Sequence, residues 1–286
     1  MKNKKIHKNI LIKLLKKVKQ NKKYNSISDE IVLDEIQKYL NENLEIGPIT
    51  SINKQTISEI RKQLHFSYSS FQTKKKRKIS KYLEELKQAK TKKQILEITN
   101  PLLSTTLSTK ERINSYLEIY KKIFNITNKP KIITDLGAGF NIFSFPYMNL
   151  DKLTYYSYDI DKEDIKLINQ YLDILNNNLS GKAAILNLRN LKEISSLPSS
   201  DIIFLFKTID ILDKPNKNHK SSEGLIKYLL ENKTDYIVAS FATKTITRKK
   251  MNFPTRKWFE LMLKRNNLKF QTIRTDNEIF YVVSKH

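Results

Sequence analysis

Residues 132–141, Ile-Ile-Thr-Asp-Leu-Gly-Ala-Gly-Phe-Asn, carry the strongest signal for fold and function in this chain. A β-branched run ends in Asp135, and Gly137 and Gly139 follow at once. This pattern predicts a buried strand that turns sharply at its carboxyl end. Glycines at such a turn let the backbone pass close to a ligand, because no Cβ stands in the way. A purely structural turn would have the same composition, so the loop alone does not establish a ligand site.

A second acidic signal lies about 20 residues further on, where the strand-like run 155–159 ends in Asp159. In nucleotide-binding α/β folds, a carboxylate at this place accepts hydrogen bonds from ribose hydroxyls. Asp161 is an alternative for the same role. The spacing suits S-adenosylmethionine (SAM) as well as NAD. The third glycine of a dinucleotide-binding fingerprint is missing after Gly139, where Asn141 follows, so the sequence favours SAM as the cofactor.

The charge balance restricts the partners of this chain. Its 286 residues include 53 Lys and Arg against 29 Asp and Glu, a net charge of +24. Such an excess predicts a polyanionic partner, either nucleic acid or an anionic membrane surface. No apolar run approaches the roughly 20 residues that span a bilayer. Cysteine is absent, which excludes disulfides, thiolate metal sites and cysteine nucleophiles. We expect a cytoplasmic monomer without a metal site or a membrane partner.

The N-terminal third is predicted to be helical and strongly basic. Apolar residues recur at helical spacing in four segments, at 6–18, 32–40, 57–64 and 79–86. Residues 1–100 carry 24 Lys and Arg against 10 Asp and Glu, a net charge of +14. Interleaved aromatic residues fit RNA docking, although a solvated charged face is the alternative. Because Pro101 falls near a boundary, residues 1–104 are predicted to form a basic helical RNA-docking domain. One continuous basic run in it comprises Lys74, Lys75, Lys76, Arg77 and Lys78.

In the rest of the chain, predicted strands and helices alternate. Strand-like runs lie at 131–135, 154–159, 183–188, 201–206 and 235–241, and helical patterns at 161–176, 221–232 and 255–266. This alternation predicts a parallel sheet with helices on both faces. Two further β-rich runs, 268–275 and 278–284, predict a closing hairpin. Before the first strand, Ser108 and Glu111 have the spacing of a capping box, which predicts a helix start.

Several segments, in their order along the chain, resemble the aminoglycoside-resistance 16S rRNA (guanine-N7) methyltransferases of the guanine-1405 type. The resemblance covers nearly the whole length and includes Asn141 in place of the usual third glycine. It implies an α/β fold, namely a class I SAM methyltransferase (Rossmann-like) sheet with a terminal antiparallel hairpin, preceded by an all-helical N-terminal domain. Residues 105–286 would then form the SAM-dependent methyltransferase domain. The matching segments are 21–24, 54–56, 108–112, 135–141, 159–160, 205–207, 240–245, 258–260 and 281–283.

The resemblance also implies roles for the residues of the cofactor site. Asp135 would orient the methionine amino group of SAM, and Arg112 would pair with the methionine carboxylate through its planar fork. Asp159 would hold the ribose hydroxyls, and Asn187 would meet the adenine edge. A turn carboxylate, a surface arginine and a strand-ending asparagine are the structural alternatives. The predicted cofactor-binding residues are Arg112, Asp135, Gly137, Gly139, Asn141, Asp159 and Asn187.

Motifs that are missing narrow the chemistry. Cytosine C5 methylation uses a cysteine, which this chain lacks. Methylation of exocyclic amines usually places an Asn/Asp-Pro-Pro-aromatic motif after the fourth strand, where this chain has Lys-Thr-Ile-Asp at 207–210. Guanine N7 needs neither device, because its lone pair lies in the base plane and is free to attack the sulfonium methyl group. The demand on the protein is positioning for in-line transfer.

Polar residues after the fourth and fifth strands stand where a target base is expected. They are predicted to position the base and to contact phosphate; a solvated lysine is the alternative for Lys207 and Lys244. Trp258 and Phe241 are candidates for stacking on a flipped base, although aromatic side chains on helices and strands more often pack inward. The catalytic candidates are Lys207, Ser240, Thr243 and Lys244.

The chain departs from the family pattern after the fifth strand. Ala242 replaces a proline, and residues 247–250 replace a glycine-rich loop. Arg248, Lys249 and Lys250 in this segment are further RNA-binding candidates. These departures affect the exact RNA target more than SAM binding.

Taken together, these features predict a SAM-dependent methyltransferase that modifies guanine N7 in the decoding region of 16S rRNA, within the small ribosomal subunit. A second enzyme hypothesis keeps the chemistry and moves the target to tRNA or another rRNA site. A third is a non-catalytic RNA-binding or ribosome-associated protein with a methyltransferase fold. Asp135 and Asp159 argue against loss of SAM binding, and Asn141 disfavours an NAD-dependent enzyme.

Overall fold

The computed structural model describes residues 8–43, 54–67, 78–213, 219–245, 249, 251 and 254–285. The chain divides into two compact units. The helical unit consists of residues 1–72 together with 160–163, and the sheet unit of residues 73–159 together with 164–286.

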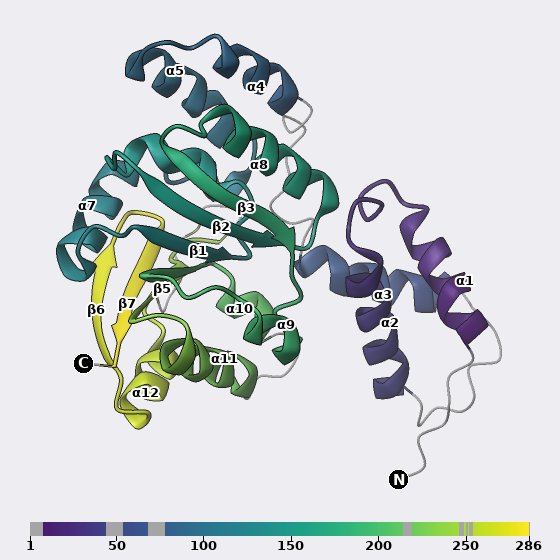
Figure 1. The fold of residues 1–286 in the computed structure, drawn as a ribbon. Helices are drawn as coiled ribbons and strands as arrows, with labels where there is room; N and C mark the ends of the chain where they lie inside the picture. The colour runs from purple at the N-terminus through teal and green to yellow at the C-terminus, as the bar shows by residue number, and fades with distance from the viewer. Residues whose placement is uncertain are drawn as a thin grey trace. The chain divides into compact units, whose positions relative to one another are not determined.

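The sheet unit is built on one seven-stranded sheet in the order β3-β2-β1-β4-β5-β7-β6 (Figure 1). Strands β1 to β5 run parallel, and β7 pairs antiparallel with both β5 and β6, so the predicted hairpin closes the sheet. The strand order reverses between β1 and β4, which is where open α/β sheets bind ligands at the carboxyl ends of their strands. The strands are β1 Ile132–Leu136, β2 Leu153–Asp159, β3 Leu179–Ile185, β4 Ile202–Phe206, β5 Tyr236–Ala242, β6 Lys269–Arg274 and β7 Glu278–Ser284.

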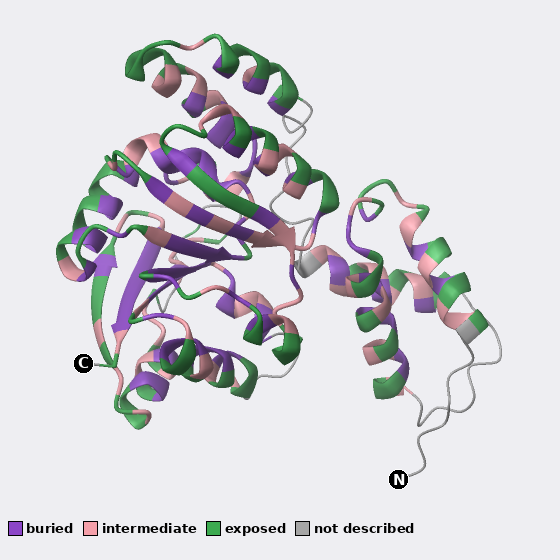
Figure 2. Cartoon of the chain, in the orientation of Figure 1, coloured by how far each residue is buried: buried purple, intermediate pink, exposed green. Residues whose placement is uncertain are grey.

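Helices pack on both faces of this sheet, as the alternating pattern predicted. Helices α4, α5, α7, η4 and α8 share one apolar cluster with one face, and α9 to α12 share another cluster with the opposite face. The central strands are therefore buried on both sides (Figure 2), and all five residues of β4 are buried. The helices are α4 Ile79–Lys87, α5 Lys92–Leu103, α6 Leu107–Lys110, α7 Tyr116–Thr127, the 3₁₀ helix η4 Asn141–Tyr147, α8 Lys162–Ile174, α9 Leu191–Ser195, α10 Ile209–Leu212, α11 Lys220–Asn232 and α12 Lys257–Arg265.

The third strand begins earlier than the sequence predicted. β3 starts at Leu179, whereas the apolar pattern placed a strand at 183–188. The reason is its place at the edge of the sheet, where Ser180, Gly181 and Lys182 are exposed. An edge strand with a solvated side needs few apolar residues, so its hydrophobic pattern is weak.

The helix start predicted at Ser108 is wrong. Ser108 lies inside the short helix α6, and the long helix α7 starts only at Tyr116. A true capping box begins α5 instead, where Thr91 Oγ1 accepts from the Gln94 N–H and Gln94 Oε1 accepts from the Thr91 N–H.

Helices α4 and α5 belong to the sheet unit, because their apolar residues join the cluster beneath α7. The boundary predicted after residue 104 coincides with the end of α5, whereas the compact units divide near residue 72. The two helices before residue 104 therefore share a core with the sheet.

The helical unit contains three helices, α1 Lys8–Lys19, α2 Asp29–Asn43 and α3 Lys54–Ser67, among the residues that the structure describes. Apolar residues spaced along each helix form its core, as the helical periodicity predicted. The segment 160–163 joins this unit through Asp161, whose Oδ2 accepts a hydrogen bond from the Ser26 hydroxyl and whose Oδ1 accepts from the Glu163 N–H. Within the described ranges, no helix has the length and apolarity to cross a membrane.

Candidate functional site

The turn after β1 is the predicted glycine loop, and both glycines have positive φ, +71° at Gly137 and +49° at Gly139. A Cβ at Gly137 would lie 2.7 Å from Thr208 Oγ1, so a larger residue does not fit. Around the Cβ position of Gly139 there is open space within 4 Å. The Gly139 N–H donates to Asp159 Oδ2 at 2.7 Å. The loop and Asp159 therefore lie together at the carboxyl edge of the sheet.

Asp135 is fully buried near the end of β1. Its Oδ2 accepts hydrogen bonds from the Tyr155 hydroxyl at 2.5 Å and from Asn141 Nδ2 at 2.9 Å. Its Oδ1 has no partner among the residues that the structure describes. Burial raises the pKa of Asp135 to about 6, although the two hydrogen bonds oppose the shift. An unpaired buried carboxylate oxygen is costly, so this position suits a cationic hydrogen-bond donor.

Asn141, two residues after Gly139, organises the site through its side chain. Besides the bond to Asp135, its Oδ1 accepts from the Tyr116 hydroxyl at 3.1 Å and from Arg112 Nη1 at 3.3 Å. The residue is 1% exposed. A glycine at this position would remove this link between Asp135 and Arg112.

Arg112 forms a buried two-point ion pair with Glu278 on β7. Arg112 Nε lies 2.8 Å from Glu278 Oε2, and Nη2 lies 3.0 Å from Oε1. The two side chains are 4% and 1% exposed. The guanidinium also lies 4.9 Å from the centre of the Phe206 ring. Three of the five N–H groups of an arginine are engaged by Glu278 and Asn141, so part of the predicted ligand-binding capacity is already used by the protein.

Lys207 follows β4 with a left-handed backbone, φ +58°. Its Nζ lies 2.6 Å from Glu111 Oε2 and 3.6 Å from Glu278 Oε2. Its N–H faces both the Ser240 carbonyl oxygen at 3.1 Å and Ser240 Oγ at 3.0 Å, and the Ser240 hydroxyl donates to Glu278. A non-glycine residue in this conformation costs on the order of 1–3 kcal/mol, and such strain concentrates at functional sites. The contacts with Ser240 and the two carboxylates hold it in place.

Glu278 was not predicted from the sequence, yet it contacts three of the predicted residues, Arg112, Lys207 and Ser240. Burial disfavours the charge of Glu278, but Arg112 and Lys207, with hydrogen bonds from Arg112 and Ser240, hold its pKa below the ordinary value. It is therefore a carboxylate at neutral pH. The sequence signal for Glu278 was its place as the first residue of β7, where one acidic residue begins a run of six buried positions. Glu111 was also misassigned, since it pairs with Lys207 and does not cap a helix.

The two remaining candidates for the cofactor site are the amide Asn187 and the carboxylate Asp161. Asn187 is half-buried in the loop after β3, where its Oδ1 accepts from the Arg189 N–H at 3.0 Å and its own N–H donates to Glu193. The side chain therefore stabilises a turn there. Asp161, the alternative to Asp159, accepts hydrogen bonds from the Ser26 hydroxyl and from the Glu163 N–H at the start of α8.

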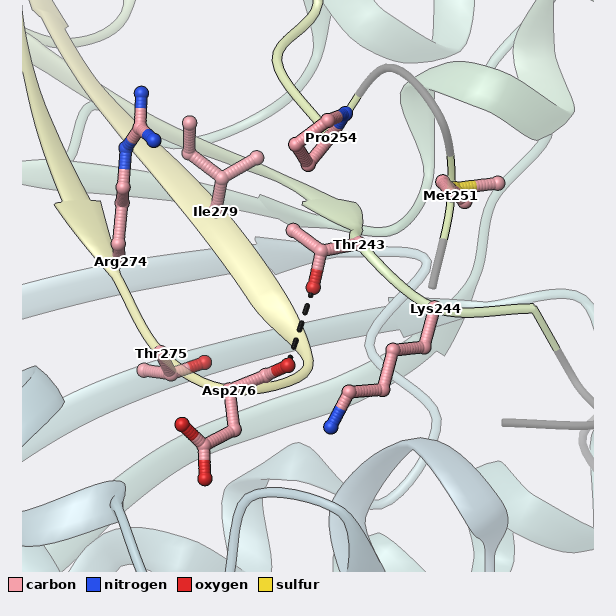
Figure 3. A pocket seen from close by; sticks show the side chains of 8 residues that line it. All are labelled: Thr243, Lys244, Met251, Pro254, Arg274, Thr275, Asp276 and Ile279. Atoms are coloured by element: carbon pink, nitrogen blue, oxygen red, sulfur yellow. Dashed lines mark hydrogen bonds between the residues drawn. The ribbon is translucent and has the colours of Figure 1, made fainter. Parts of the chain in front are cut away.

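Thr243 and Lys244 line a pocket of about 210 Å³ at the carboxyl end of β5 (Figure 3). The turn between β6 and β7 forms its other wall, and Thr243 Oγ1 lies 3.4 Å from the Asp276 carbonyl oxygen that it faces. The pocket thus opens at the same edge of the sheet as Ser240 and Glu278. The lining residues are Thr243, Lys244, Met251, Pro254, Arg274, Thr275, Asp276 and Ile279.

The aromatic candidates are part of the core beneath this edge. Phe241 is fully buried and meets Trp258 and Phe259 edge-on, at centroid distances of 6.0 and 4.9 Å. Trp258 stacks on His219 at 3.6 Å, with 8° between the ring planes. The inward packing that was the alternative to base stacking is therefore what the structure shows for Phe241.

Most of the predicted RNA-binding residues lie outside the described residues, namely Lys74, Lys75, Lys76, Arg77, Arg248 and Lys250. Lys78 is exposed at the start of α4, and Lys249 is exposed with its N–H donating to Thr245 Oγ1. Both cations are on the surface, as RNA contact requires.

These features define a class I SAM-dependent methyltransferase. They are the seven-stranded sheet with its closing hairpin, the glycine turn, and Asp135 and Asp159 where the strand order reverses. The chain belongs to the ribosomal RNA methyltransferase (FmrO) family, whose model matches residues 61–282.

Among curated proteins, the chain is similar to the 16S rRNA (guanine(1405)-N(7))-methyltransferase of Proteus mirabilis, with 32% identity over 251 residues, 81% of this chain and 85% of the relative. A protein of the same name from Micromonospora echinospora is 28% identical over 64% of each chain.

Solved structures support the fold over nearly the whole length. The 16S rRNA methyltransferase RmtF, in complex with S-adenosylhomocysteine (SAH), matches with a TM-score of 0.74 at 17% identity, over 96% of this chain and 98% of that one. The 16S rRNA methylase RmtB matches with a TM-score of 0.71 at 16% identity, over 96% and 98%. The predicted α/β fold is thereby confirmed.

Proposed function

We propose that this protein transfers the methyl group of SAM to N7 of a guanine in the decoding region of 16S rRNA. Its membership of the ribosomal RNA methyltransferase family and its similarity to the Proteus mirabilis protein support this reaction. The observation that carries the proposal is the buried Asp135 beside the glycine turn, with one carboxylate oxygen unpaired among the described residues. It lies at the point where the strand order reverses.

The residues around this point fit SAM. Asp135 Oδ1 would accept from the methionine amino group, and Asp159 would bind the ribose hydroxyls beside the open space at Gly139. Arg112 has N–H groups beyond those bound to Glu278 and Asn141, and these would meet the methionine carboxylate. Asn187 is proposed for the adenine edge. When bound, SAM supplies an electrophilic methyl group on a positively charged sulfur.

The proposed role of the residues after β4 and β5 is to position the guanine. N7 attacks with an in-plane lone pair and needs no general base, so orientation is the main requirement. Lys207 is fixed by Glu111, Glu278 and Ser240 at this edge. Thr243 and Lys244 line the neighbouring pocket and would contact the base or its phosphate.

Recognition of the RNA is assigned to the basic N-terminal residues 1–104, including the run 74–78, and to Arg248, Lys249 and Lys250. Positive charge gives affinity for the phosphate backbone. The proposed partner is the rRNA of the small ribosomal subunit, bound by a monomer in the cytoplasm.

The reaction is tested by treating purified small subunits with the protein and SAM, then cleaving the rRNA with borohydride and aniline, which break the chain at 7-methylguanosine. We expect one new cleavage in the decoding region, and a weaker one in naked rRNA. Formation of 5-methylcytidine or N6-methyladenosine would contradict the chemistry. Cleavage elsewhere in rRNA, or in tRNA only, would contradict the target and leave the chemistry intact.

A further inference from the structure

Glu278 is the point where the charged groups of the site converge. It contacts Arg112 with both carboxylate oxygens, at 2.8 and 3.0 Å, and accepts the Ser240 hydroxyl. Lys207 Nζ lies 3.6 Å from it and 2.6 Å from Glu111. Glu278 therefore contacts Arg112 before β1, Lys207 after β4 and Ser240 on β5, and fixes their relative positions.

These four ionisable side chains contain two cations and two carboxylates. Arg112 is tied to Glu278, and Lys207 is shared between Glu278 and Glu111. Asn141 then connects this group to Asp135 by direct hydrogen bonds. The charges balance, so a positively charged ligand group bound beside Asp135 meets no net repulsion from the cluster.

The two carboxylates differ in their contact with water. The side chain of Glu278 is 1% exposed, whereas that of Glu111 is 23% exposed. Water screens a charge at Glu111 and does so much less at Glu278. Loss of the Glu278 charge would therefore leave an excess cation in a low-dielectric setting.

We infer that Glu278 is a positioning residue whose buried charge keeps the site from repelling the positively charged sulfur of the methyl donor SAM, a charge that the product SAH lacks. This inference rests on the proposed function, because it takes SAM to bind beside Asp135. SAM and SAH differ by one methyl group and by the positive charge on sulfur. A change in the net charge of the cluster therefore changes the affinity for SAM more than the affinity for SAH.

Calorimetric titration of the full chain with SAM and with SAH measures this difference. In Glu278→Gln, which keeps the size and removes the charge, the ratio of SAM to SAH affinity should fall about fivefold to twentyfold, as for one unit charge acting over about 10–15 Å at an effective dielectric constant of about 20. The matched control is Glu118→Gln, which removes an exposed carboxylate of α7 that pairs with Lys122. This control should leave the ratio unchanged, and circular dichroism verifies that both variants fold.

A second variant keeps the inference testable if Glu278→Gln does not fold. Lys207→Met removes a cation from the same cluster, so the ratio should rise above that of the wild type. In Lys207→Met/Glu278→Gln the charges balance again, and the ratio should return close to the wild-type value.

Equal losses of SAM and SAH affinity in Glu278→Gln, or a lowered ratio in Lys207→Met, would overturn the inference, because a purely structural role affects both ligands alike. A wild-type protein that binds neither ligand would instead refute the proposed function. The two failures are therefore distinguishable.

Discussion

At the scale of single residues, burial disfavours the charged forms of the side chains that this site needs. Asp135 lies where burial raises its pKa to about 6, and its Oδ1 has no partner in the described part of the chain. Arg112 and Glu278 are buried too, and each supplies a counter-charge to the other. Such arrangements are costly for folding and useful for binding charged ligands, because the protein groups are desolvated before the ligand arrives.

The pKa of Asp135 predicts how SAM binding depends on pH. Above about pH 6 the carboxylate is ionised and would pair with the methionine amino group; below it the carboxyl is protonated and this pairing is lost. Affinity for SAM should therefore fall by up to about tenfold per pH unit below the pKa. Titrations from pH 5 to 7.5 measure this. Asp135→Asn should bind SAM weakly, and its affinity should not change with pH over this range. A pH dependence that persists in this variant would assign the titration to another group.

The Arg112–Glu278 pair predicts an asymmetric effect on stability. Arg112→Ala leaves a buried carboxylate with Lys207 as its remaining cation, at 3.6 Å. The free energy of unfolding should drop by about 3–5 kcal/mol. Arg112→Met/Glu278→Leu removes both charges and should recover most of the loss, as measured by urea denaturation. Equal destabilisation of the single and double variants would show that packing, and not the unpaired charge, sets the cost.

At the scale of elements, the short turn between β1 and η4 decides whether the loop can approach a ligand. Its two glycines have positive φ but different surroundings. A Cβ at Gly137 would lie 2.7 Å from Thr208 Oγ1, whereas the Cβ position of Gly139 is open. The first glycine serves packing against the residue after Lys207, and the second keeps space free beside Asp159.

This difference predicts separable effects of two alanine substitutions. Gly137→Ala should lower stability by about 2–3 kcal/mol, because strain and a steric clash add. Gly139→Ala carries only the backbone strain, about 1 kcal/mol, but places a methyl group where the ligand would pass. Thermal unfolding should therefore rank Gly137→Ala as the less stable variant, and SAM titration should show a clear loss in Gly139→Ala. Unchanged SAM affinity in Gly139→Ala would place the ligand elsewhere.

At the scale of the whole molecule, positive charge and cofactor chemistry are separated along the chain. Residues 1–100 carry a net +14 of the total +24, while the cofactor residues described above all follow residue 110. Affinity for RNA and affinity for SAM should therefore respond to different substitutions.

Charge reversal at Lys75, Lys76 and Arg77 tests this separation. Binding of the triple Glu variant to small subunits should weaken. The slope of log affinity against log salt concentration should flatten by about 0.7–0.9 for each lost phosphate contact. SAM affinity should stay at the wild-type value. An unchanged salt slope would show that this run is a solvated surface and would shift the RNA contact to Lys244, Arg248, Lys249 and Lys250.

Local patterns predicted the strands apart from the start of β3, the glycine turn and the place of Asp159 at the end of β2, because these depend on neighbouring residues and on a fixed spacing. The site's ionic contacts did not follow from such patterns. Arg112 and Glu278 are 166 residues apart, and only the sheet order brings them together. Glu111 fitted a helix cap as well as an ion pair, and nothing in its neighbours distinguishes the two. Burial of Glu278 depends likewise on β7 lying inside the sheet.

The stacking of Trp258 on His219 gives the protein an intrinsic fluorescence signal at this site. Trp258 is the only tryptophan in the chain, and its indole ring is in van der Waals contact with an imidazole. Indole emission depends on the immediate contacts of the ring, so separation of the two rings should change the fluorescence of the protein. Because Trp258 also touches Phe241 on β5, stopped-flow fluorescence of the unlabelled protein measures any change in these ring contacts when RNA or cofactor is added.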